Sequence, residues 1–150
     1  MIVIKVVRAS IVATLVSLGL VAGSMTGWAG ATVAKSPKLV VAPSAGLKNG
    51  VVVKVRGYGF KPHDHVYIVE CLVTAKGQAG CNTLGATAAV ISAKGILSVT
   101  KFRVITGAIG SGTCGTKTVN LKSCAISVGN ASGRDSAVTR ISFVAPKKGY

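Results

Sequence analysis

The chain has 150 residues, with 18 Lys and Arg against only three acidic residues, for a net charge of +15. Hydrophobic residues make up 49% of it and the mean hydropathy is +0.58, which excludes an intrinsically disordered chain. The length fits one domain better than two. Three carboxylates are few for an acid–base enzyme or a calcium site.

The N-terminal segment has the pattern of an export signal. Lys5 and Arg8 precede an apolar run at residues 9–22, and small residues follow, ending in Ala29-Gly30-Ala31. This order predicts a secretory signal peptide over residues 1–31, cleaved within 29–32. The alternative is a retained membrane anchor, but a spanning helix needs about 20 apolar residues and this run is short and interrupted by glycine.

Export changes the chain that has to fold. The mature domain is then residues 32–150, outside the cell, and it keeps 16 of the 18 cations because Lys5 and Arg8 leave with the signal. Its net charge is +13. No second apolar run of comparable length follows, so we expect no transmembrane segment after cleavage.

The four cysteines predict disulfides, because an even count outside the cytosol is usually paired. Four cysteines permit three pairings. Nine residues separate Cys71 from Cys81, and nine separate Cys114 from Cys124, so two local bridges are the simplest choice. A zinc site would favour cysteines two to four residues apart, which this chain lacks.

The mature chain reads as short β-rich runs separated by Gly, Ser, Asn and Lys, with no helical period of useful length. Turn signals such as Lys48-Asn49-Gly50 and Lys94-Gly95 lie between the runs. This pattern predicts an all-β, seven-stranded immunoglobulin-like antiparallel sandwich. The seven predicted strands are residues 38–42, 51–56, 66–73, 87–92, 96–104, 123–128 and 137–144.

Cations alternate with apolar residues on the second and fifth predicted strands. Successive side chains of a strand point to opposite faces, and these two strands share a sheet in an immunoglobulin-type sandwich. We therefore predict a cationic outer face that attracts anionic polymers. The alternative is that scattered cations only keep the domain soluble and protect strand edges. The face consists of Lys54, Arg56, Lys101 and Arg103.

Polar residues that could support catalysis are few. His63-Asp64-His65 follows Lys61-Pro62, a turn signal, so we expect an exposed loop rather than a metal site or a hydrolase triad. Glu70 lies beside Cys71, and we expect it on a polar strand face rather than as a general base. The sequence predicts no enzyme and no metal.

Several segments, in their order and spacing, resemble the neocarzinostatin family of secreted apoproteins that carry enediyne chromophores. The matching segments are Pro43–Phe60, Tyr67–Cys71, the ten-residue step to Cys81-Asn82, Cys124–Gly133 and Ile141-Ser142-Phe143. The resemblance implies an immunoglobulin-like barrel with a small disulfide-bearing ribbon region. It also implies a cleft between them for a small apolar ligand.

The resemblance also indicates positions for the cleft. Where family members carry aromatic side chains, this chain has Val73, Ala86 and the segment ending in Ile109; Ala79 is expected beside them and Gly129 at the rim. Family apoproteins are typically acidic, whereas this chain is strongly basic.

Two functions follow from these observations. The first is a secreted, non-enzymatic, monomeric apoprotein for a non-covalent apolar chromophore, acting in antibacterial defence with DNA as the target of the ligand. Weak nonspecific binding to DNA or another polyanion would accompany it. The second is a secreted immunoglobulin-like interaction module that binds anionic polymers or envelope surfaces and has lost the chromophore.

Overall fold

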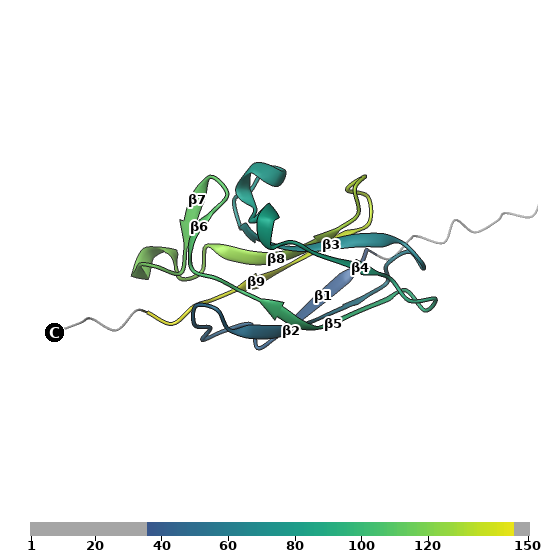
Figure 1. Cartoon of the computed structure of the whole chain (residues 1–150), viewed down its shortest axis with the longest axis horizontal. Coiled ribbons are helices and arrows are strands. Elements are labelled where there is room, and N and C mark those ends of the chain that lie inside the picture. Colours follow the sequence, from purple (N-terminus) through teal and green to yellow (C-terminus); the bar gives the residue numbers. More distant parts are fainter. Residues whose placement is uncertain (1–35, 146–150) are drawn as a thin grey trace, which may run out of the picture. The chain divides into compact units, whose positions relative to one another are not determined.

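The computed structural model describes residues 36–145 (Figure 1). The predicted signal peptide and its cleavage site lie outside the described residues. No helix within residues 36–145 is long and apolar enough to cross a membrane.

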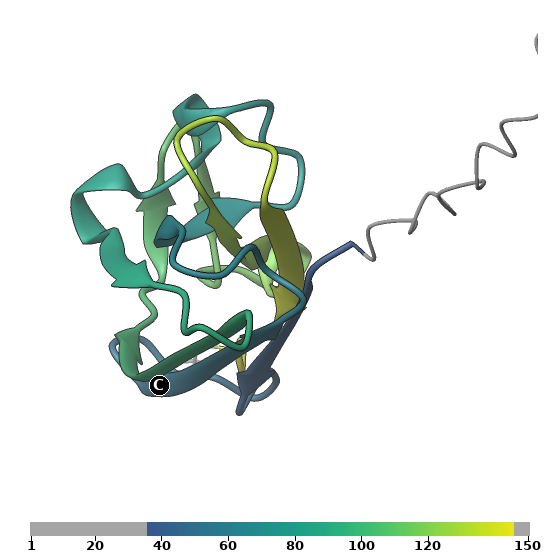
Figure 2. The same ribbon diagram turned by 90° about the vertical axis from the view of Figure 1, so that its right-hand side faces the viewer.

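Two antiparallel sheets form the domain, which confirms the predicted fold class. One has three strands in the order β1-β2-β5, and the other has four in the order β4-β3-β8-β9 (Figures 1 and 2). The first sheet consists of β1 (Lys38–Ala42), β2 (Val52–Tyr58) and β5 (Ile96–Arg103). The second consists of β4 (Thr87–Val90), β3 (His65–Leu72), β8 (Cys124–Gly129) and β9 (Ser136–Ile141).

Short elements complete the domain. A hairpin, the ribbon that the resemblance implied, pairs β6 (Gly107–Ile109) with β7 (Gly112–Cys114). Single 3-10 turns occur at η1 (Gln78–Gly80), η2 (Thr83–Gly85) and η3 (Thr118–Asn120). The seven strands predicted from alternation are all present, although the last ends at Ile141 rather than at residue 144.

The core lies between the sheets and is built by alternation. Val53 and Val55 of β2 point inward and are almost fully buried, as are Ile68 of β3 and Ile126 of β8. Phe102 from β5 is among the largest buried side chains. Burying each such side chain contributes about 1.5–3 kcal/mol, so the apolar half of each strand fixes which face is inside.

A β-bulge interrupts the alternation of β5. Val53 pairs with Phe102, but Val55 pairs with Val99, so β5 has one more residue than β2 in this interval. As a result, Thr100 and Lys101 are both exposed while the next residue, Phe102, returns to the core. The bulge therefore lets one strand face the core with an irregular apolar spacing.

Two features distinguish the edges of the sheets: the sheet that β4 joins, and a side-chain hydrogen bond between β9 and β1. β4 pairs with β3 and not with the three-stranded sheet, unlike the constant-type immunoglobulin arrangement. At the opposite edge, the Thr139 hydroxyl of β9 donates a 2.6 Å hydrogen bond to the Leu39 carbonyl of β1. This bond links the two sheets where no strand pairing does.

Candidate functional site

The outer face of the four-stranded sheet forms the floor of a groove. In β3, Val66, Ile68 and Glu70 point inward, so Tyr67, Val69 and Cys71 alternate to the outer face. All three outward residues line the groove. The floor therefore follows from the same period-2 pattern that builds the core.

Strand register extends this floor across the sheet. Val69 pairs with Ser127 of β8, and Ser127 pairs with Val138 of β9. Tyr67 pairs with Gly129 in the neighbouring row. Gly129 adds no side chain to the floor beside Tyr67, and the next residue of that row is the small Ser136 of β9.

Loops on either side of the floor form the walls. The chain from Val73 to Ala86 supplies one wall, and the turn after β8 supplies Asn130, Ala131 and Gly133. Figure 1 shows both loops and the β6–β7 hairpin rising from the same side of the four-stranded sheet, away from the three-stranded sheet. The groove has a volume of about 690 Å³, within the range of small-molecule sites.

Each disulfide fixes one of these projecting segments to the sheet. Cys71 of β3 is bonded to Cys81, which closes the wall loop. Cys114 of β7 is bonded to Cys124 of β8, which anchors the hairpin. Closing a loop of this length contributes about 2.5–3 kcal/mol in the chain-entropy picture. The two bridges thus hold the groove in shape without a ligand.

The hairpin also supports the wall loop from behind. The backbone N–H of Ser111 donates a 2.8 Å hydrogen bond to the Ala79 carbonyl. The neighbouring Gly110 has φ +52°, and a Cβ there would overlap the Ala79 carbonyl oxygen. Only glycine allows this approach, so the hairpin packs closely against the wall loop without itself lining the groove.

Three of the five predicted cleft residues line the groove: Val73, Ala86 and Gly129. Ala79 and Ile109 do not. Ile109 is fully buried, because alternation in the short β6 strand turns it into the core while Ala108 faces outward. Ala79 is exposed on η1, and its contribution is the carbonyl that receives the hairpin.

Tyr67 is an aromatic groove residue that was not among the cleft residues predicted from the family resemblance. Its side chain is 52% exposed, and it lines the floor. Two exposed apolar side chains, Val138 and Val73, line the groove with it. Alternation gave the signal, since Tyr67 stands between the inward-facing Val66 and Ile68.

Asp64 forms a hydrogen-bonded contact at one end of the groove. Its Oδ2 accepts a 2.7 Å bond from the side-chain amide of Asn130, a groove residue. Its Oδ1 accepts from the His65 backbone N–H, and both His63 and His65 are exposed. The carboxylate thus fixes the position of the rim turn. His63 lies in the exposed turn before β3, as predicted, whereas His65 is the exposed first residue of β3 and pairs with Val90 of β4.

Glu70 is buried, contrary to the expectation of a polar strand face. It is 1% exposed and shares the inward face of β3 with Ile68, because the two are two residues apart. Its Oε2 accepts a 2.9 Å hydrogen bond from the Ile105 backbone N–H, whereas Oε1 has no partner among the described residues. Desolvation raises the pKa of Glu70 to about 7, and the Ile105 bond opposes this.

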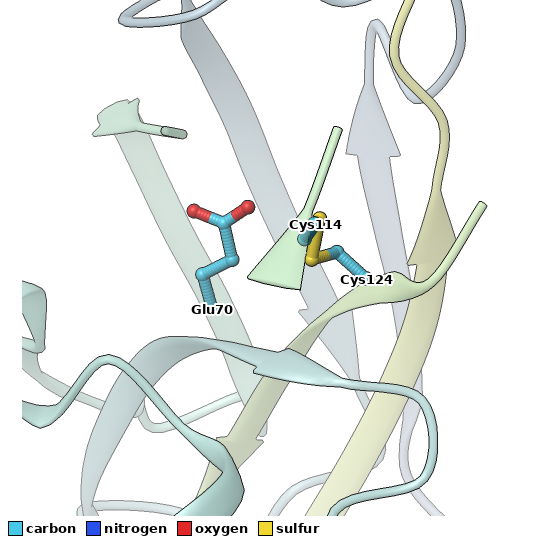
Figure 3. Close-up of side chains that lie close together, drawn as sticks. All are labelled: Glu70, Cys114 and Cys124. Atoms are coloured by element: carbon cyan, nitrogen blue, oxygen red, sulfur yellow. A yellow bond between two sulfur atoms is a disulfide. The ribbon is translucent and has the colours of Figure 1, made fainter. Parts of the chain in front are cut away.

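Glu70 lies beside the Cys114–Cys124 disulfide (Figure 3). In the described part of the chain, this is the one group of three or more possible metal-ligand side chains with ligand atoms within 4.8 Å of one another. The two sulfurs are bonded to each other, so they offer no thiolate to a metal ion. The trio is a carboxyl group packed against a disulfide.

Residues 39–143 match the family model of the neocarzinostatin family, which is well over half of the chain. The chain belongs to the neocarzinostatin family. Among solved structures it is similar to macromomycin, with 28% identity and a TM-score of 0.58 over 73% of this chain and 100% of that one. Apokedarcidin, known from its solution conformation, matches at 28% identity with a TM-score of 0.49 over the same shares.

The range that matches the neocarzinostatin family model covers nearly all of the described domain. It begins in β1 and ends just after β9. Both sheets, both disulfides and the whole groove therefore lie inside the region that the family shares.

Proposed function

We propose that the protein is a secreted, non-enzymatic apoprotein that holds a small, apolar, conjugated ligand in the groove over β3, β8 and β9. The observation that carries this proposal is the exposed Tyr67 ring on an apolar floor, beside a wall loop that the Cys71–Cys81 disulfide anchors. Exposed apolar side chains gathered in a concave site favour an apolar partner.

Membership of the neocarzinostatin family supports the class of ligand. Family members carry enediyne chromophores, which are flat over part of their surface. An offset stack on an aromatic ring contributes about 0.5–1.5 kcal/mol beyond the burial of its area. Tyr67 supplies one such ring, and its strand partner Gly129 adds no side chain to the floor beside it.

The wider role follows from the ligand. An enediyne-like chromophore cleaves DNA, so we infer antibacterial defence, with the protein protecting and delivering its cargo. Export by the predicted signal peptide would place the carrier and its cargo outside the producing cell.

Binding of a neutral fluorescent naphthalene, N-phenyl-1-naphthylamine, tests the groove directly. A neutral probe avoids attraction by the net charge of +15. We expect Tyr67→Ala to weaken binding about 3- to 10-fold, the loss of one aromatic contact. The matched control is Tyr58→Ala, because Tyr58 is 45% exposed on the other sheet. Equal binding by both variants would contradict the proposal.

The alternative is an immunoglobulin-like interaction module that has lost the chromophore. It is favoured by one observation, the concentration of cations on the three-stranded sheet. Absence of probe binding to the wild-type protein would favour this alternative over carriage.

A further inference from the structure

The outer face of the three-stranded sheet is a cationic surface. Lys54 and Arg56 of β2 and Lys101 and Arg103 of β5 are all exposed, as the alternation predicted. Lys38 of β1 is exposed on the same sheet, where its residue pairs with Tyr58. We call these five side chains the cationic face.

Strand pairing keeps these cations at fixed spacings. Arg103 pairs with Val52, two residues before Lys54, and the bulge in β5 leaves Lys101 exposed as well. Neighbouring strands are about 4.8 Å apart, and alternate residues of one strand are about 6.7 Å apart. The Arg103 guanidinium is also held by a 2.8 Å hydrogen bond to the Gly50 carbonyl.

The acidic residues of the chain do not neutralise this face. Glu70 is buried between the sheets. Asp64 is bonded to Asn130 at the groove, and Asp135 accepts a 2.9 Å hydrogen bond from the Lys61 backbone N–H. The cationic face therefore carries five positive charges with no acid of the described chain paired to them.

We propose that the cationic face binds duplex DNA through its phosphates. Duplex DNA carries one negative charge per about 1.7 Å of its axis on a stiff rod. Cations fixed on a sheet lose little further freedom when they meet such a rod. A single strand is a poorer partner, because it needs stacking rings and Tyr58 is the one aromatic among the exposed residues of β1, β2 and β5.

This inference goes beyond ligand carriage and does not depend on it. The cationic face and the groove floor are the outer faces of two different sheets. A carrier could thus dock on DNA with its groove still open to solvent or filled. The face has no element that enters a DNA groove to read bases, so binding is independent of sequence.

Fluorescence anisotropy with a labelled 20-base-pair duplex tests the proposal. Contacts to about four phosphates predict a slope of about −3 to −4 for log K against log salt, or about 100-fold weaker binding between 50 and 200 mM salt. The variant Lys54→Glu, Arg56→Glu, Lys101→Glu, Arg103→Glu is expected to lose more than 50-fold in affinity at 50 mM salt.

The control changes the same charge elsewhere. Reversing four exposed cations outside the cationic face to Glu is expected to cost less than 5-fold; they are Lys76, Lys94, Lys122 and Arg134. Equal losses in the two variants would show that net charge alone acts, and would overturn the proposal. If the fourfold variant does not fold, the double variant Lys54→Gln, Arg56→Gln replaces it. We expect this variant to lose about 5- to 10-fold in affinity for the duplex.

Competition identifies the polymer. Heparin and single-stranded DNA of equal total charge are added to the labelled complex, and we expect the unlabelled duplex to displace it at the lowest concentration. Displacement by heparin at a lower concentration than by duplex would assign the face to an anionic polysaccharide and contradict the DNA proposal.

Discussion

The carboxylate of Glu70 accepts a 2.9 Å hydrogen bond from the backbone N–H of Ile105. This bond ties the middle of β3 to the segment that leaves β5 and enters the hairpin. A buried carboxyl group thus helps to position the hairpin that supports the groove wall.

Glu70 makes stability depend on pH. Its pKa is about 7 in the folded protein, against 4.5 for an exposed glutamate side chain. Below pH 4.5 both states are protonated and the penalty is absent. As the pH rises to 7, the unfolded state ionises first and folding loses about 3 kcal/mol. Urea unfolding between pH 4 and 8 measures this loss.

The variant Glu70→Gln isolates this group. It cannot ionise, so we expect its unfolding free energy to be nearly flat between pH 5 and 8. A wild-type protein whose stability is equally flat, or a variant that keeps the full pH dependence, would contradict the assignment.

Gly95 is predicted to be intolerant of a side chain. It has φ +70°, and a Cβ there would lie 2.6 Å from the Phe60 carbonyl oxygen. Gly95→Ala is expected to cost 2 kcal/mol or more, about 1 from the backbone conformation and the rest from the contact. Gly46→Ala is the control, because Gly46 has φ +67° with nothing within 4 Å. Equal thermal unfolding of the two variants would argue against the contact.

Removing one disulfide is expected to loosen one wall segment. Cys71→Ala with Cys81→Ala should cost about 2.5–3 kcal/mol and speed hydrogen exchange within residues 73–86. Cys114→Ala with Cys124→Ala should act instead on the hairpin at residues 107–114. Because the Ser111 N–H to Ala79 carbonyl hydrogen bond joins the hairpin to the wall loop, we expect each variant also to speed exchange slightly in the other segment. Identical exchange patterns in the two variants would show that neither bridge acts locally.

Alternation predicted most of the sheet structure, and its failures have local causes. It predicted all seven sandwich strands and the exposure of Lys54 and Arg103. It also places Glu70 on the inward face with Ile68, but the usual exposure of carboxylates led to the opposite expectation. Burial of Glu70 depends on Ile105, which is 35 residues away, and no local pattern contains that contact.

The groove was harder to predict because its walls come from distant segments. Val73 and Gly129 follow directly from strands, and both line it. Ile109 lies in a three-residue strand, too short for its period to show which side is buried. Ala79 meets the hairpin through its backbone, which carries no signal in residue type. The outward direction of Tyr67 was predictable from the buried residues on either side of it. The family resemblance did not indicate it, because Tyr67 is not at a position where family members carry cleft aromatics.

The central claim is that the groove carries a small conjugated ligand in the native protein. Native mass spectrometry of the protein, purified from its own culture medium, tests this most directly. We predict a 1:1 complex with a light-absorbing small molecule, which is lost or reduced in Tyr67→Ala and kept in Tyr58→Ala. Apoprotein alone, across growth conditions and in both variants, would contradict the claim.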